Sequence, residues 1–433
     1  MASLLAEPLT LPCGATLPNR MAKAAMTEGL SDVYGRATGE LDRLYLAWSE
    51  GGAGMLLSGN IQIDADHLER PGNVIIDREP DADTKRALSH WAAAATRGGN
   101  HFWAQISHAG RQTQKAVNPH PKAPSAVKLG LPGGQFGQPV ALTEDEILAI
   151  IARFGTAARV CRETGFTGVQ IHAAHGYLFS QFLSPRTNMR DDRWGGSLEN
   201  RARALLFTVN TVRTLVGPDF PVSAKLNSAD FQKGGFGFED SLQVARWLQD
   251  AGVDLIEISG GTYEQPKLLG IEGLEEPEEQ NVAASTLQRE AYFVDFAKAM
   301  RSEVKIPLMV TGGFRTRSAM EQALKQGAAD IIGIGRPLCY FPDGPKRLLN
   351  GMEMLPRKEN DLALLPPALQ WLTRWKTFRA IDSFACQYWF FSQLYALGRT
   401  GRPATDMSVF QAFREVESTH KRWLKERRAA LGR

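Results

Sequence analysis

Cysteine is scarce in this sequence. The four cysteines, Cys13, Cys161, Cys339 and Cys386, lie far apart, and no two of them form a Cys-x-x-Cys pair. Thiolate zinc ribbons and iron–sulfur clusters need closely spaced cysteines, so the sequence excludes both kinds of site. The same scarcity argues against a secreted disulfide scaffold.

Long apolar runs and a strong net charge are also lacking. No stretch of about 18 apolar residues is present, so we expect no transmembrane helix. The first eight residues, MASLLAEP, have neither a basic region nor a long apolar region, so no signal peptide is predicted. Fifty basic residues against 47 acidic ones leave a charge of +3, which implies no strong attraction to nucleic acid or a membrane surface. We therefore expect a cytoplasmic protein with neither as a partner.

What the sequence does contain is a repeated alternation of short apolar runs and amphipathic stretches. Several runs are apolar at consecutive positions, which is typical of strands that are buried on both faces. Eight such runs are expected to be strands: 19–25, 54–59, 101–107, 168–172, 221–227, 253–259, 306–311 and 330–335. Helical patterns lie between them, at 81–98, 144–164, 198–216, 240–251, 292–302 and 318–327. This alternation over about 340 residues predicts a TIM (β/α)8 barrel.

A doubly wound open sheet would give the same alternation. It is the weaker interpretation because no Gly-x-Gly-x-x-Gly motif follows the first strand. Residues 10–17, before the first strand, are expected to form a small hairpin that closes the floor of the barrel. The Pro- and Gly-rich segment 112–139 is expected to be a long loop above its mouth.

The last part of the chain differs from the rest. We expect residues 1–350 to form the barrel and residues 351–433 to form a C-terminal helical extension. The extension holds 12 of the 38 aromatic residues, so it should pack as helices on the barrel or on a second subunit rather than stay disordered. Self-association through the extension is therefore expected. Its final stretch, 420–433, is predicted to be a solvated basic surface helix.

His172 ends the fourth expected strand, and His175 and Tyr177 follow it, in His172-Ala173-Ala174-His175-Gly176-Tyr177. In a TIM barrel, residues just after a strand lie at the functional mouth. Neutral imidazoles can donate hydrogen bonds to a developing enolate oxygen, and Tyr177 can act as a general acid. Two other interpretations stay open: a zinc site that would need a third ligand, and two structural histidines in a loop.

Other polar residues lie in or just after other expected strands of the barrel. The seventh and eighth runs lead into Gly312-Gly313 and Gly335-Arg336, where this fold often binds a phosphate; ordinary tight turns are the alternative. Gln105, in the third strand, can bind the edge of a planar heterocycle. Lys225, in the fifth, can hold an anion or form a Schiff base. Thr27, after the first strand, can donate to a ligand carbonyl.

The segment from Ile171 to Arg203, IHAAHGYLFSQFLSPRTNMRDDRWGGSLENRAR, resembles the old yellow enzyme family of FMN-dependent ene-reductases. Further matching pieces stand in the same order: Asn19-Arg20-Met21, Ala24-Ala25-Met26-Thr27, Gln105 to Arg111, Val310 to Gly313 and Gly335-Arg336-Pro337. The resemblance covers about residues 1–350. The long form of the family, the NADH:flavin oxidoreductases, is also similar in the tail.

The resemblance implies roles for these residues. His172 and His175 would hold the carbonyl or nitro oxygen of the substrate, and Tyr177 would protonate its alpha carbon. FMN would lie across the mouth as the prosthetic group. Its expected contacts are Ala24, Ala25, Met26, Thr27, Gly59 or Asn60, Gln105, His172, Lys225, Gly312, Gly313, Gly335 and Arg336. No metal is expected at the site.

Three positions depart from patterns common in the family. Lys225 stands where many members have Arg, so a positive charge near flavin N1 and O2 is kept but the planar fork of donors is lost. Thr27 stands where some members have Cys, and His175 where others have Asn. Members with a cluster and a second nucleotide-binding domain are excluded by chain length and by the missing Cys motif.

The predicted function is reduction of the activated C=C bond of α,β-unsaturated carbonyl or nitro compounds, with hydride from NADH or NADPH. An isomerase or an amine or xenobiotic oxidoreductase on the same barrel is the main alternative. A metal-dependent hydrolase and a catalytically silent flavin-binding protein are further ones. Arg111, Lys115 and Lys122 can meet the 2′-phosphate of NADPH, although a solvated basic loop is the better explanation of them.

Overall fold

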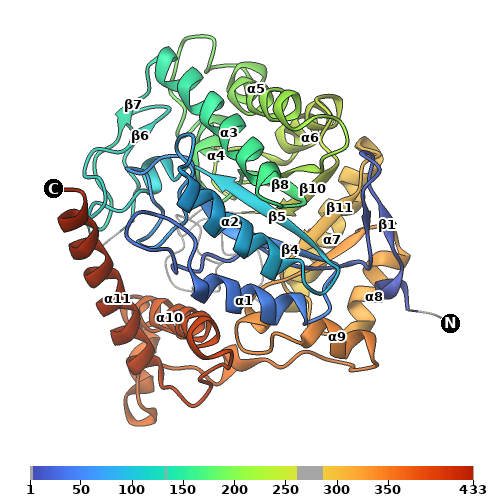
Figure 1. Ribbon diagram of the computed structural model, residues 1–433, viewed down its shortest axis with the longest axis vertical. Coiled ribbons are helices and arrows are strands. Elements are labelled where there is room, and N and C mark those ends of the chain that lie inside the picture. The colour runs from blue at the N-terminus through green and yellow to red at the C-terminus, as the bar shows by residue number, and fades with distance from the viewer. Residues whose placement is uncertain (1–2, 132–133, 261–285, 433) are drawn as a thin grey trace.

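Eight parallel strands close into a barrel (Figure 1). The computed structural model describes residues 3–131, 134–260 and 286–432. The strands are β3 Met21–Lys23, β4 Met55–Gln62, β5 His101–Ser107, β8 Gly168–Ala173, β9 Val222–Asn227, β10 Leu255–Ser259, β11 Leu308–Thr311 and β12 Ile331–Ile334. They are paired in this order, and β12 pairs with β3 to close the barrel. Each of the eight expected runs overlaps one strand, although β4 and β8 extend beyond the expected ends, so the predicted TIM barrel is confirmed.

Helices surround the barrel, and all six predicted ones are present. The barrel helices are α1 Gly39–Ser49, α2 Ala82–Ala95, α3 Glu144–Glu163, α4 Leu178–Leu183, α5 Leu198–Val216, α6 Phe238–Asp250, α7 Thr286–Glu303, α8 Arg317–Lys325 and α9 Gly344–Leu349. Thr143 and Glu146 form the expected capping box at the start of α3, and the side chain of Ser197 caps α5. Helix α1 was not predicted, although Leu41, Leu44 and Trp48 give it a buried stripe with helical spacing.

The two ends of the barrel differ in chemistry. At the floor, strand β1 (Leu9–Thr10) pairs antiparallel with β2 (Thr16–Leu17), which confirms the predicted hairpin. Leu11 and Leu17 pack there against interior side chains that include Met55, Trp103 and Leu255. Two residues further along β5 and β10, Gln105 and Glu257 follow Trp103 and Leu255 as buried polar residues. The floor is therefore the stable apolar end and the opposite end is the one equipped for chemistry.

An irregularity in β4 sets the direction of one of these polar residues. Leu57 pairs with Trp103 of β5, but the next pair is Asn60 with Gln105, so two residues of β4 face one of β5. Such a bulge re-aims the side chains that follow it. Asn60 consequently lies beside Gln105 on the inner side of the strand pair.

The segment 112–139 is irregular over most of its described length, as expected of a long loop. Its short strand β6 (Lys122–Ala123) pairs with β7 (Val140–Ala141) just beyond it. No helix in the described residues is long and apolar enough to cross a membrane.

The C-terminal extension is helical and packs on the barrel. Helix α10 (Lys376–Thr400) lies against α1, and α11 (Val409–Ala430) lies against α10 (Figure 1). Trp389 and Tyr395 are buried, whereas Trp371 and Trp375 are each 52% exposed. The expectation of a solvated final helix is wrong for one face of α11. Trp423 is buried there against Leu68 and Ile75, which belong to the loop after β4.

Candidate active site at the barrel mouth

Parallel strands end at the same rim, so side chains that are distant in sequence meet at the mouth. His172, Lys225 and Gln105 extend from β8, β9 and β5, and all three are buried. His172 and Lys225 are register partners on adjacent strands. The structure thus brings together residues that the sequence predicted separately.

His172, His175 and Tyr177 form one cluster. The ring of His172 lies 4.7 Å from the ring of Tyr177 and 5.2 Å from that of His175, measured between centroids. The backbone N–H of Ala174 donates to Nδ1 of His172 at 3.2 Å. A neutral His172 therefore carries its proton on Nε2, which leaves that atom as a hydrogen-bond donor.

The backbone of His175 is held in an unusual conformation. Its φ of 60° lies in the left-handed region, which few non-glycine residues adopt. Its N–H donates to Oδ1 of Asn227 at 3.1 Å, and its carbonyl accepts from Nε2 of Gln112. Its Nε2 lies 2.5 Å from Oγ of Ser259. Contacts from three elements therefore fix the direction of this imidazole.

Both imidazoles are neutral at ordinary pH. Burial lowers the pKa of His172 well below its usual value, and repulsion from a protonated His175 and from Lys225 lowers it further. Burial and the charge of Lys225 do the same for the pKa of His175. The pair can donate hydrogen bonds to a ligand oxygen without being protonated.

Lys225 is ion-paired rather than alone. Its Nζ lies 2.9 Å from Oε1 of Glu257, which is fully buried in β10. Glu257 was not predicted from the sequence, because a single carboxylate inside an apolar run has no local signal of its partner. A lysine engaged in this way fits the predicted anion-holding role better than that of a Schiff-base nucleophile, which must be uncharged to react.

Thr27 and Asn60 both donate to the carboxylate of Glu69, a second residue that was not predicted from the sequence. The hydroxyl of Thr27 donates to Oε1 of Glu69 at 2.6 Å, and Nδ2 of Asn60 donates to Oε2. Gly59 faces elsewhere: a Cβ at this position would lie 2.2 Å from Glu28 Oε2. Of the two residues expected to contact a ligand from β4, Asn60 is the better placed.

The loops after β11 and β12 have the glycine-dependent backbone conformations that the sequence predicted. Gly312 and Gly313 have φ values of 124° and 80°, which L side chains rarely adopt. A Cβ at Gly335 would meet no atom closer than Sδ of Met26 at 4.0 Å, so this glycine borders open space. Arg336 follows it at the start of a short 3-10 helix, Arg336–Cys339.

These residues fit FMN. Oδ1 of Asn60 and Oγ1 of Thr311 are buried at the mouth with no hydrogen-bond partner among the described residues. Unsatisfied buried polar atoms indicate a polar ligand. The glycine turns after β11 and β12 can cradle a phosphate, and Gln105, Lys225 and Asn60 supply both donors and acceptors for the edge of a flavin ring.

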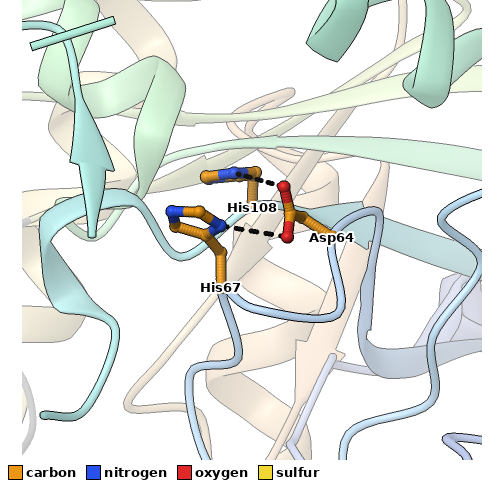
Figure 2. Close-up of side chains that lie close together, drawn as sticks. All are labelled: Asp64, His67 and His108. Carbon is orange, nitrogen blue, oxygen red and sulfur yellow. Dashed lines mark ion pairs between the residues drawn. The ribbon is translucent and has the colours of Figure 1, made fainter. Parts of the chain in front are cut away.

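The described residues contain one group with metal-ligand spacing. The ligand atoms of Asp64, His67 and His108 lie within 4.8 Å of one another (Figure 2). However, Lys122 N–H donates to Nε2 of His67, and Gly110 N–H donates to Nδ1 of His108. Neutral rings with these partners carry protons on the nitrogens that face Asp64, so those nitrogens are donors and not metal ligands.

The electrostatics agree with a carboxylate held by donors. Burial alone would raise the pKa of Asp64, but hydrogen bonds and charges of His108 and His67 outweigh it and lower the pKa. Arg153 adds an ion pair to Asp64 at 2.6 Å. The group is best described as a structural bridge between the loops after β4 and β5.

The three basic residues that could meet the 2′-phosphate of NADPH differ in their contacts. Arg111 is buried and donates to the carbonyl of Lys128 at 3.2 Å. Lys122 pairs with Glu146 at 2.6 Å. Of the three, only Lys115 has an exposed side chain without such a contact in the described part of the chain.

A (β/α)8 barrel with paired glycine turns after its last strands and a His-His-Tyr cluster at its mouth defines the class of flavin-dependent barrel oxidoreductases. Comparison with known proteins agrees. The model of the NADH:flavin oxidoreductase / NADH oxidase family matches residues 4–354. The chain belongs to this family. It is an FMN-dependent NADH:flavin oxidoreductase of the old yellow enzyme type, with NADH or NADPH as co-substrate.

Several relatives are similar over nearly their whole length. The NADH-dependent flavin oxidoreductase iliE of Hypocrea jecorina is 38% identical over 394 residues, which are 86% of this chain and 96% of the relative. The NADH-dependent flavin oxidoreductase iccE of Talaromyces variabilis is 35% identical over 93% of this chain and 100% of its own. Among solved structures, the old yellow enzyme homologue from Zymomonas mobilis has a TM-score of 0.66 and 26% identity, covering 81% of this chain and 93% of its own.

Proposed function

We propose that the enzyme reduces the activated C=C bond of α,β-unsaturated carbonyl or nitro compounds. The observation that supports this most directly is the convergence of His172, His175 and Tyr177 at one rim of the mouth. Two neutral imidazoles next to a phenol match a substrate in which negative charge builds on one oxygen and a carbon nearby takes a proton. Bound FMN supplies hydride transfer between the nicotinamide and the alkene.

The chain's own residues have distinct tasks in this proposal. Nε2 of His172, with His175 beside it, donates to the substrate oxygen and so stabilises the charge that develops there. Tyr177 donates a proton from its hydroxyl to the alpha carbon. Asn60, Gln105 and Lys225 would hold the pyrimidine edge of the cofactor, and its phosphate would be held by Gly312, Gly313, Gly335 and Arg336. Ala24 to Thr27 border the ring.

The test is an anaerobic stopped-flow measurement of the two half-reactions. NADH and NADPH are mixed separately with the yellow protein, and bleaching of the flavin is followed. The reduced protein is then mixed with enones, nitroalkenes and maleimides. Rapid reoxidation by these acceptors supports the proposal. Reduction of the flavin by an amine, or isomerisation without any nicotinamide, would support the alternative chemistries instead.

We also propose that residues 1–350 are the catalytic barrel and residues 351–433 an extension that mediates self-association. The partly exposed rings of Trp371, Trp375 and Phe378 support this proposal, since large apolar side chains grouped on a surface are typical of interfaces. Light scattering of the full chain and of a triple Ser variant at these three positions tests it. An identical mass for both proteins would contradict it.

A further inference from the structure

Glu257 is a fully buried carboxylate in the upper, polar layer of the barrel. It lies on β10 in register with Lys225 on β9, and both side chains are buried. Burying a charge is costly unless partners compensate it. Glu257 has no task in the reaction proposed above, so the cost of burying its charge calls for another explanation.

Glu257 belongs to a chain of ion-paired and hydrogen-bonded side chains. Its Oε1 lies 2.9 Å from Nζ of Lys225. Its Oε2 accepts from Nε2 of Gln170 at 3.0 Å, and Oε1 of Gln170 accepts from Nε2 of Gln105 at 2.6 Å. Four strands, β5, β8, β9 and β10, therefore contribute one continuous polar network.

The carboxylate of Glu257 fixes the orientation of the amide groups in this network. An ionised carboxylate only accepts, so Gln170 must turn its amide nitrogen toward Glu257 and its oxygen toward Gln105. Gln105 then uses one N–H on Gln170, which leaves its oxygen and its other N–H for the ligand. At the same time, Glu257 offsets the positive charge of Lys225, because opposite charges 2.9 Å apart act at longer range as a dipole.

We propose that Glu257 is a positioning residue that lowers the reduction potential of the bound flavin by neutralising Lys225 and by fixing the amide direction of Gln105. The inference rests on the proposed placement of the flavin next to Lys225 and Gln105. A lone buried cation there would stabilise the negative charge that the ring gains on reduction. With Glu257 present, that stabilisation is smaller and the reduced cofactor is a stronger hydride donor.

The experiment compares Glu257→Gln with the unchanged holoenzyme. The midpoint potential is measured by equilibration with a reference dye, and affinity for sulfite, an anion that bleaches flavins, is measured by titration. We expect Glu257→Gln to have a more positive potential and to bind sulfite at least tenfold more tightly, which corresponds to about 1.4 kcal/mol. Lys225→Met should shift both quantities in the opposite direction, and the double variant should lie between the two single variants.

An unchanged or more negative potential in Glu257→Gln would overturn the proposal. If that variant does not retain FMN, Glu257→Asp is the deciding variant, because it keeps the charge but draws it away from Lys225. Its midpoint potential is expected to be slightly more positive, and an unchanged midpoint potential counts against the proposed role. Failure of the proposed function is a different result: the unchanged protein would then fail to reduce alkenes even though its potential responds to Glu257.

Discussion

The indole N–H of Trp423 donates to the carbonyl oxygen of Ser31 at 3.1 Å, joining residues 392 positions apart. Arg427, one turn further along α11, donates to the carbonyls of Val33 at 2.6 Å and Ala65 at 3.4 Å. These carbonyls belong to the loops after β3 and β4, which also carry Thr27 and Glu69. The last helix thus holds the loops that border the proposed flavin site.

Replacing Trp423 should therefore weaken the contact between α11 and these loops and so destabilise the fold. Trp423→Ala is expected to lower the free energy of unfolding by about 3–5 kcal/mol, because it empties a buried site. Trp423→Phe should cost only about 1 kcal/mol, mainly for the lost hydrogen bond. Denaturant unfolding measures both. Phe410→Ala on the same helix is the control, since Phe410 is 56% exposed; equal losses at the two positions would contradict the role of Trp423.

Tyr177→Phe should separate the two half-reactions. Without the phenol, alkene reduction should slow by about 10²–10⁴-fold, the range for loss of a general acid. Flavin reduction by NADH should be essentially unchanged, because it needs no proton from Tyr177. Stopped-flow absorbance follows both steps, with Tyr34→Phe at an exposed position as control. A similar loss in both steps would refute the proton-donor role.

The lowered pKa values of His172 and His175 predict how acid affects the fold. Below pH 6.5 the unfolded chain binds protons on these residues that the folded chain does not, so stability falls as the pH drops. Each such histidine contributes a slope of up to about 1.4 kcal/mol per pH unit. His172→Asn should reduce the slope between pH 6.5 and 5 in urea unfolding; a slope equal to that of the unchanged protein would argue against a neutral His172.

Lys23 predicts a change at the alkaline end. It is fully buried under Tyr45 and Trp48 of α1, and burial lowers its pKa to about 8, an effect partly opposed by the charge of Glu28. Between pH 8 and 10.5 the unfolded chain keeps a proton that the folded chain has lost, so Lys23 makes stability rise with pH in this window.

Unfolding by urea at pH 8 and pH 10 tests this. Lys23→Met should remove the rise, which amounts to up to about 1.4 kcal/mol per pH unit. Lys421→Met, at a side chain that is 80% exposed, should keep it. Parallel pH dependence of Lys23→Met and the unchanged protein would show that Lys23 is not the group that titrates.

The Asp64 group should behave as a structural bridge and not as a metal centre. Asp64→Asn is expected to lower stability by about 1–3 kcal/mol, because the amide keeps one acceptor oxygen but loses the negative charge and turns an N–H2 group toward a donor. Dialysis against a chelator should leave the thermal midpoint unchanged. Metal analysis together with calorimetry checks both; a stoichiometric metal whose removal mimics Asp64→Asn would contradict the assignment.

Strand positions and the residues that follow them could be predicted, but their partners could not. His172 and Tyr177 stand out because they lie at the end of an apolar run and just after it, and a parallel barrel places all such positions at one rim. Glu69, Glu257 and the inner face of α11 gave no comparable signal. Their contacts join residues separated by tens to hundreds of positions, and nothing in the local pattern reveals which side chains will meet.

The sequence by itself determined the barrel, because the period of buried strands and amphipathic helices follows from where apolar side chains must go to leave water. It also determined the likeness to a flavoenzyme family, through short motifs at strand ends. Tertiary structure alone decided that Lys225 is balanced by Glu257, that Thr27 donates to Glu69, and that α11 holds the mouth loops. The physical reason is that charge pairing and helix docking depend on distances in space, which chain folding sets and residue order does not.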